Sequence, residues 1–165
     1  MPILEPPHSH HVNAALGWLE LGNFTEAEAE LNTLSDEWRA CPEVLFVRWE
    51  IQARRKDWNA ALETATALVG AAPHKPEGWI QQSFSLHELK RTREAWARLL
   101  EVESQFPNVS TIPYNLACYA CRLGDHTEAM RRLEDAIKVG GKTQIKALAL
   151  RDADLEPLWG RVRAL

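Results

Sequence analysis

The sequence contains few cysteines and no long apolar run. The three cysteines, Cys41, Cys118 and Cys121, are too few and too unevenly spaced for the disulfide framework of a small secreted domain. Charged residues interrupt every apolar stretch, and Met1–His11 lacks the basic and apolar regions of a signal peptide. We therefore expect a cytoplasmic protein with neither a membrane-spanning nor a secretory segment.

An excess of positive charge is also lacking. The chain of 165 residues has 19 Lys and Arg against 23 Asp and Glu, a formal net charge of -4. This balance has the wrong sign for binding nucleic acid or an anionic bilayer through the overall field of the protein. We expect no nucleic acid and no membrane among its partners.

Catalytic motifs are missing as well. The chain has no Gly-rich phosphate loop, no zinc-binding histidine pair with a glutamate and no Gly-x-Ser-x-Gly elbow. A metal could in principle bind His8, His10 and His11, but histidine-rich chain starts ordinarily have no such role. We expect no enzyme activity, no cofactor and no metal.

An internal repeat is what the sequence does contain. Four segments each end in an alanine, and the positions of successive alanines differ by 34: Ala27, Ala61, Ala95 and Ala129. Apolar residues follow each alanine after four and seven positions, which is the stripe of a helix with one buried face. The same period relates Pro73 to Pro107, where a stripe ends, and Pro42 to Pro76, where the first turn of a helix tolerates proline.

A second amphipathic stretch precedes each of these helices, so each repeat reads as two antiparallel helices joined by a short turn. A helical hairpin cannot bury its own apolar face, but stacked neighbours can. Small alanines at the recurrent position allow the two helices to approach closely. The sequence therefore predicts an all-α solenoid.

These residues resemble the tetratricopeptide repeat (TPR) family, whose helical hairpin motif has the same length as this period. The most specific stretch is Tyr114–Ala136, with Gly124 and Asp125 in its turn, and Trp79 and Leu86 match the motif in the third repeat. The second repeat departs from it. Its first helix is read instead with a buried stripe shifted by one residue, made of Val44, Val47 and Ile51.

The resemblance implies a right-handed superhelical solenoid that forms a single domain over residues 1–165. Its four repeats are expected at about 8–41, 42–75, 76–109 and 110–141, followed by capping helices over 143–165. Asp154 is the expected N-cap of the last helix.

The pair Cys118 and Cys121 is the one motif in the sequence that resembles a redox or metal-binding site. Two thiols three residues apart share a helix face, and His87, aligned one repeat earlier with Cys121, could supply a third metal ligand. The pair falls in the body of a predicted helix, however, away from the helix N-terminus that lowers thiol pKa values. We favour a structural role for both cysteines.

In arrays of this kind the first helices line a concave groove. The repeat period aligns three rows of candidate partner-binding residues, which are Val12, Phe46, Ile80 and Tyr114, then Leu16, Glu50, Phe84 and Cys118, then Leu19, His87 and Cys121. If Phe46, Ile80, Phe84 and Tyr114 are exposed together, they form an apolar patch that marks an interaction site. If they only pack between helices, they are core.

The resemblance favours a non-catalytic scaffold that binds a peptide or partner protein in this groove. The alternatives are a chaperone-like or self-associating module, for which a homodimer is possible, and a redox protein built on the cysteine pair.

Some TPR domains clamp a C-terminal carboxylate through cations on three adjacent repeats. The matching positions lack those cations in either register, so we expect no binding of such tails. The two sets are Val12, Leu16, Val47, Glu77 and Gln81, or Phe46, Glu50, Gln81, Thr111 and Asn115.

Overall fold

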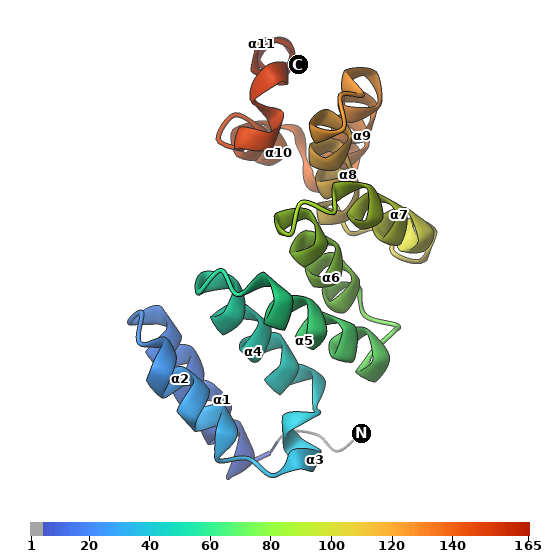
Figure 1. The fold of residues 1–165 in the computed structure, drawn as a ribbon. Coiled ribbons are helices and arrows are strands. Elements are labelled where there is room, and N and C mark those ends of the chain that lie inside the picture. The colour runs from blue at the N-terminus through green and yellow to red at the C-terminus, as the bar shows by residue number, and fades with distance from the viewer. Residues whose placement is uncertain (1–4) are drawn as a thin grey trace. The chain divides into compact units, whose positions relative to one another are not determined.

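The computed structural model describes residues 5–165, which form helices and connecting turns without a strand (Figure 1). Residues 1–4 lie outside the described residues. They are the start of Met1–His11, the segment in which no targeting signal was expected. No helix in the described range is long and apolar enough to cross a membrane. The α-helices are α1 (His8–Glu20), α2 (Phe24–Asn32), α3 (Asp36–Arg39), α4 (Pro42–Arg54), α5 (Trp58–Ala71), α6 (Pro76–Glu88), α7 (Thr92–Val102), α8 (Thr111–Arg122), α9 (His126–Gly140), α10 (Lys142–Ala149) and α11 (Trp159–Ala164), and the 3₁₀ turns are η1 (Glu103–Gln105) and η2 (Ala153–Leu158).

The chain divides into two compact units, residues 1–85 and 86–165, with the boundary inside α6. The predicted all-α series of four helical hairpins, α1–α2, α4–α5, α6–α7 and α8–α9, followed by capping helices, is confirmed. A single rigid domain and a right-handed superhelix over the whole chain stay predictions.

The repeat period sets where the helices begin. α1, α4 and α6 start at matching positions of successive repeats, and Pro42 and Pro76 are the first residues of their helices, as predicted. The recurrent alanines are fully buried, and every residue four or seven positions after them is buried as well, which gives the set Leu31, Leu34, Ala65, Leu68, Leu99, Val102, Leu133 and Ala136. The apolar stripe predicted from the sequence is therefore the buried face of each second helix.

The first unit contains the pairs α1–α2 and α4–α5, which pack side by side (Figure 1). In α4 the buried stripe is Val44, Val47 and Ile51, so the shifted register is confirmed. The physical reason is Trp49, which occupies the position where the other repeats have a small residue. Its indole N–H donates to the Ser85 hydroxyl at 2.9 Å.

All four hairpin turns use the same backbone conformation. Gly22, Lys56, Lys90 and Gly124 occupy the same position in successive repeats and have φ values of 75°, 58°, 65° and 88°. Glycine reaches this left-handed region freely, whereas a side chain there is strained. The next residue caps the second helix in three repeats, where Asn23, Asp57 and Asp125 accept the N–H three positions on.

Lys56→Gly and Lys90→Gly should each raise the free energy of unfolding by about 1 kcal/mol, because they remove a strained residue. Urea titration followed by circular dichroism measures this. Arg55→Gly is the matched control: its φ is -75°, so glycine there should lower stability by about 0.5 kcal/mol. Destabilisation by Lys56→Gly would contradict the strain.

The second unit is built on the pair α8–α9, with α10 packed on α9 and η2 packed on α8. Asp152, and not Asp154, is the N-cap of η2, and its side chain accepts the N–H of Asp154 at 3.0 Å. The expectation that Asp154 caps the last helix is therefore wrong, because the helical turns begin one residue before it. The apolar side chains of this segment, Leu155, Leu158 and Val162, are buried.

A charged cluster holds α9 in the second unit. The buried guanidinium of Arg132 donates to both oxygens of Glu103 at 2.6 Å and to Glu128 at 2.7 Å, and it lies 5.3 Å from the ring of Trp96. Glu128 also accepts two hydrogen bonds from Arg131. These contacts, led by the Arg131 hydrogen bonds, lower the pKa of Glu128 to about 2.

Because the folded pKa of Glu128 lies below its unfolded value, the carboxylate stabilises the protein above the unfolded value. That contribution is lost as the pH falls toward 2. Glu128→Gln should therefore reduce the acid sensitivity of unfolding between pH 4.5 and pH 2, measured by thermal melts across that range. Glu134 is exposed on the same helix and takes part in none of these hydrogen bonds, so Glu134→Gln is the matched control, and the effect of Glu128→Gln should exceed its effect. Identical pH profiles for wild type and Glu128→Gln would contradict this assignment.

Candidate functional site

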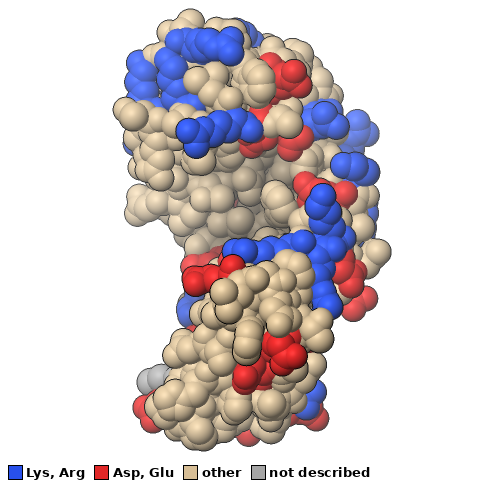
Figure 2. All heavy atoms as spheres, turned by 90° about the vertical axis from the view of Figure 1, so that its left-hand side faces the viewer, with Lys and Arg blue, Asp and Glu red and all other residues tan. Residues whose placement is uncertain are grey.

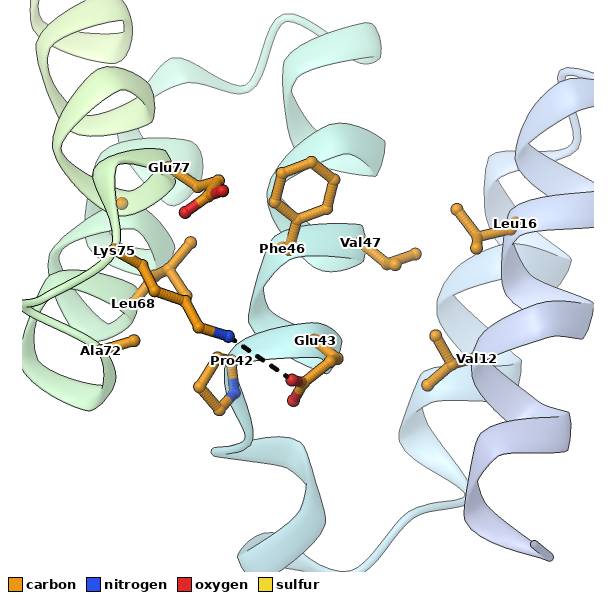
Figure 3. Close-up of a pocket in the computed structure, with 11 residues that line it drawn as sticks. Val12, Leu16, Pro42, Glu43, Phe46, Val47, Leu68, Ala72, Lys75 and Glu77 are labelled. Carbon is orange, nitrogen blue, oxygen red and sulfur yellow. Dashed lines mark ion pairs between the residues drawn. The ribbon is translucent and has the colours of Figure 1, made fainter. Parts of the chain in front are cut away.

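An apolar pocket with a cavity volume of about 390 Å³ lies within the first unit. The first helices of the first and second repeats, α1 and α4, supply its two sides, and α5 and the start of α6 complete it (Figure 3). Its lining consists of Val12, Leu16, Pro42, Glu43, Phe46, Val47, Leu68, Ala72, Lys75, Glu77 and Gly78.

Three of the predicted groove residues meet here. Val12 and Leu16 are one turn apart on α1 and point toward α4, where Phe46 lies beside Val47 (Figure 3). Residues from α5 and the loop after it were not predicted as pocket residues. Leu68, for example, belongs to the helix stripe that the period marks as core, and one side chain can serve both the core and a pocket wall.

Charged residues surround the opening of the pocket. Lys75 Nζ lies 3.9 Å from Glu43 Oε1, and both side chains are half exposed. Glu77 also lines the pocket, and no ion pair is recorded for it within residues 5–165. The predicted groove residue Glu50 lies one turn after Phe46 on α4 and does not line the pocket. Of the charged residues that do line it, two are carboxylates and one is an ammonium group, so the lining has a net negative charge.

Close packing at Gly78 shapes the same wall. A Cβ atom there would lie 2.9 Å from the backbone nitrogen of Val69, so α6 approaches α5 more closely than any other residue would allow.

The remaining predicted residues of the first unit have different surroundings. Leu19 is 1% exposed and belongs to the core, while Ile80 is half-buried on α6. Phe84 is also half-buried and makes edge contacts with Trp49 and Trp58, with ring centroids 6.2 and 5.7 Å apart. Phe84 therefore belongs to an aromatic cluster and does not line the pocket.

In the second unit, the predicted groove residues contact the segment that follows α10. The Tyr114 hydroxyl donates to Asp152 Oδ2 at 2.9 Å, and Cys118 Sγ lies 3.3 Å from the same oxygen. His87 is 6% exposed, and its Nε2 lies 2.8 Å from Asp154 Oδ2. Nothing in the repeat period could have placed this non-repeating segment on α8.

The environment of the cysteine pair disfavours thiolate chemistry. Burial, followed by the nearby Asp152 carboxylate, raises the pKa of Cys118 well above its ordinary value. Burial and the Asp154 carboxylate likewise raise the pKa of Cys121. Among residues 5–165, no three His, Cys, Asp or Glu side chains are grouped so that they could hold a metal ion.

Surface charge is mixed in sign. On the face drawn in Figure 2, blue and red side chains lie next to one another in several places. Broad tan areas without charge lie between these places. No field of one sign covers this face.

Helical hairpins that recur at one constant period place this chain in the class of helical repeat proteins. Solved TPR structures have the same fold. TTC0263, a thermophilic TPR protein of Thermus thermophilus, superimposes with a TM-score of 0.70 at 18% identity, over 95% of this chain and 99% of that one. YrrB, a TPR protein with an unusual peptide-binding site, gives 0.69 at 14% identity, over 86% and 73%. MamA gives 0.68 at 15% identity, over 90% and 89%.

The sequence matches no protein-family model and none of the curated proteins. The structural likenesses establish the fold: this chain has the TPR fold, as the sequence resemblance predicted.

Phe84→Ala should lower the free energy of unfolding by about 2 kcal/mol, because it leaves a void between Trp49 and Trp58. Phe46→Ala should cost about 1 kcal/mol, since one side of that ring already faces a cavity and makes fewer contacts. The two variants are each other's control, and thermal melts compare them. Equal losses would show that Phe46 is packed as tightly as Phe84.

Proposed function

We propose that this protein is a non-catalytic interaction scaffold whose first unit binds a segment of a partner protein in the pocket between α1 and α4. The observation that carries the proposal is the apolar cavity lined by Val12, Leu16 and Phe46. A soluble protein seldom leaves a concave apolar surface open without using it for binding. Peptide binding by YrrB, a protein of the same fold, supports this type of function.

The pocket also specifies the chemistry of its ligand. The cavity suits an apolar side chain, because most of its lining consists of methyl, methylene and aromatic groups. Around it, Glu43 and Glu77 outnumber Lys75, which favours a cationic residue next to the apolar anchor. The ligand is therefore a peptide segment that places a Leu, Met or Phe beside a Lys or Arg. An acidic C-terminal tail is repelled by the same carboxylates.

A panel of fluorescein-labelled decapeptides tests this proposal. Each peptide carries one Leu, Met or Phe and one Lys at a set spacing in a Ser and Gly background, and the matched set carries Glu in place of Lys. We expect fluorescence anisotropy to detect binding of at least one Lys peptide, with at least ten-fold weaker binding of its Glu counterpart. This ratio corresponds to about 1.4 kcal/mol.

Variants then locate the binding site. Leu16→Ala and Glu77→Gln should each weaken the complex, whereas Leu21→Ala and Glu63→Gln should not. Leu21 is 77% exposed at the end of α1, Glu63 is exposed on α5, and neither lines the pocket. Binding that is indifferent to Leu16, or a preference for the Glu peptides, would refute the pocket or its chemistry.

A further inference from the structure

The same repeat positions are used differently in the two units. Val12, Leu16 and Phe46 line an open pocket in the first unit, and their counterparts along the repeat period in the second unit are Tyr114 and Cys118. There, the chain's own residues Asp152–Leu158 lie against α8. A segment of this protein thus occupies a surface that corresponds to the pocket of the first unit.

The contacts of this segment are those of a carboxylate-binding site. Besides the Tyr114 and Cys118 contacts to Asp152, Asp154 lies 2.8 Å from His87 Nε2 and 3.4 Å from Arg122 Nε. His87 Nδ1 is in turn 3.0 Å from the Thr92 hydroxyl, which fixes the ring. Two carboxylates two residues apart are therefore each held by a pair of donors on α6 and α8.

An apolar side chain completes the recognition pattern. Leu155 follows the second carboxylate directly and is fully buried. Pro157 keeps the segment short by interrupting helical hydrogen bonding. The residues of this segment that are held by hydrogen bonds or buried therefore form the sequence pattern Asp-x-Asp-Leu.

The segment leaves part of the positive charge next to it unused. Arg122 also lines a hollow of about 450 Å³ together with Lys90, Arg91 and Arg93, where Glu94 is the one carboxylate. Glu94 pairs with Arg91. A peptide with additional acidic residues can therefore gain contacts that the chain's own segment does not make.

We propose that the face of α8 carrying Tyr114 and Cys118 is a receptor site for acidic Asp-x-Asp-Leu segments of a partner protein, and that residues Asp152–Leu155 are its displaceable internal occupant. A partner competes with this occupant by adding contacts to Lys90 and Arg93. The site belongs to the second unit alone, so its failure and the failure of the pocket in the first unit are separate results.

The probe is a fluorescein-labelled peptide, EEEDADLEPLEEE, which carries the residues found at 152–158 between glutamates. The matched control peptide is EEENANLEPLEEE. We expect the full chain to bind the first peptide and not the second. Weakening the internal occupant with Asp152→Asn and Asp154→Asn should tighten binding by roughly ten-fold, because the receptor surface is then free for a larger fraction of the time.

Alkylation of Cys118, read by peptide mass spectrometry, reports occupation of the same surface. It should be slow in the wild type at all protein concentrations, faster in the double variant, and slow again when the first peptide is added. Cys41, buried in the first unit, is the internal reference for unfolding of that unit, and circular dichroism reports whether the double variant keeps the helices of the second unit. Arg122→Gln should weaken peptide binding, whereas the pocket variant Leu16→Ala should leave it unchanged.

Several results would overturn the proposal. One is equal affinity of wild type and the double variant for the peptide, or no binding to either. A second is loss of helicity in the double variant, whether or not Cys41 reacts, which would make the segment a structural part of the second unit. A third is Cys118 protection that disappears on dilution, which would mean that a second copy supplies the segment.

Discussion

The close approach of two helices at a buried alanine is the constraint on which this structure depends. Ala27, Ala61, Ala95 and Ala129 have no exposed surface, and each is the fourth residue of the second helix of its hairpin. A larger side chain there would separate the helices and shift the stripes that follow. One hairpin cannot cover its own apolar face, so its burial also depends on a neighbouring repeat. The constant repeat period is the sequence record of that geometry.

Features that a periodic pattern of apolar residues reports could be predicted from the sequence, whereas contacts between particular non-repeating residues could not. The hairpins, their starting prolines and the shifted stripe of α4 follow from periodic patterns, which report which face of a helix is buried. The contact of Asp152 with Tyr114 joins residues 38 positions apart and has no counterpart in other repeats. The pocket could be predicted in part. The repeat period aligned Val12, Leu16 and Phe46, whereas Lys75 lies in the loop between α5 and α6 and was not marked by the period.

The lysines at two hairpin turns show how strongly the repeat imposes its backbone. Lys56 and Lys90 adopt the conformation that Gly22 and Gly124 adopt without strain, at the same repeat position. A single turn would relax into a conformation that suits its own residue. Here the helices on both sides are held by burial, so the turn must close in one way whatever residue occupies it. Local preference is overruled by packing that is set elsewhere in the repeat.

The chemistry of the groove positions explains why one unit has an open pocket and the other a covered surface. An apolar wall such as that formed by Val12, Leu16 and Phe46 loses only hydrophobic burial when nothing lies against it. A surface that carries His87, Tyr114 and Cys118 presents hydrogen-bond donors in a site largely removed from water, and donors left without acceptors there are costly. Carboxylates are the acceptors that satisfy such donors best. Polar substitutions at repeat positions that are otherwise apolar thus create the requirement for an acidic segment, which the chain's own residues Asp152–Leu155 meet.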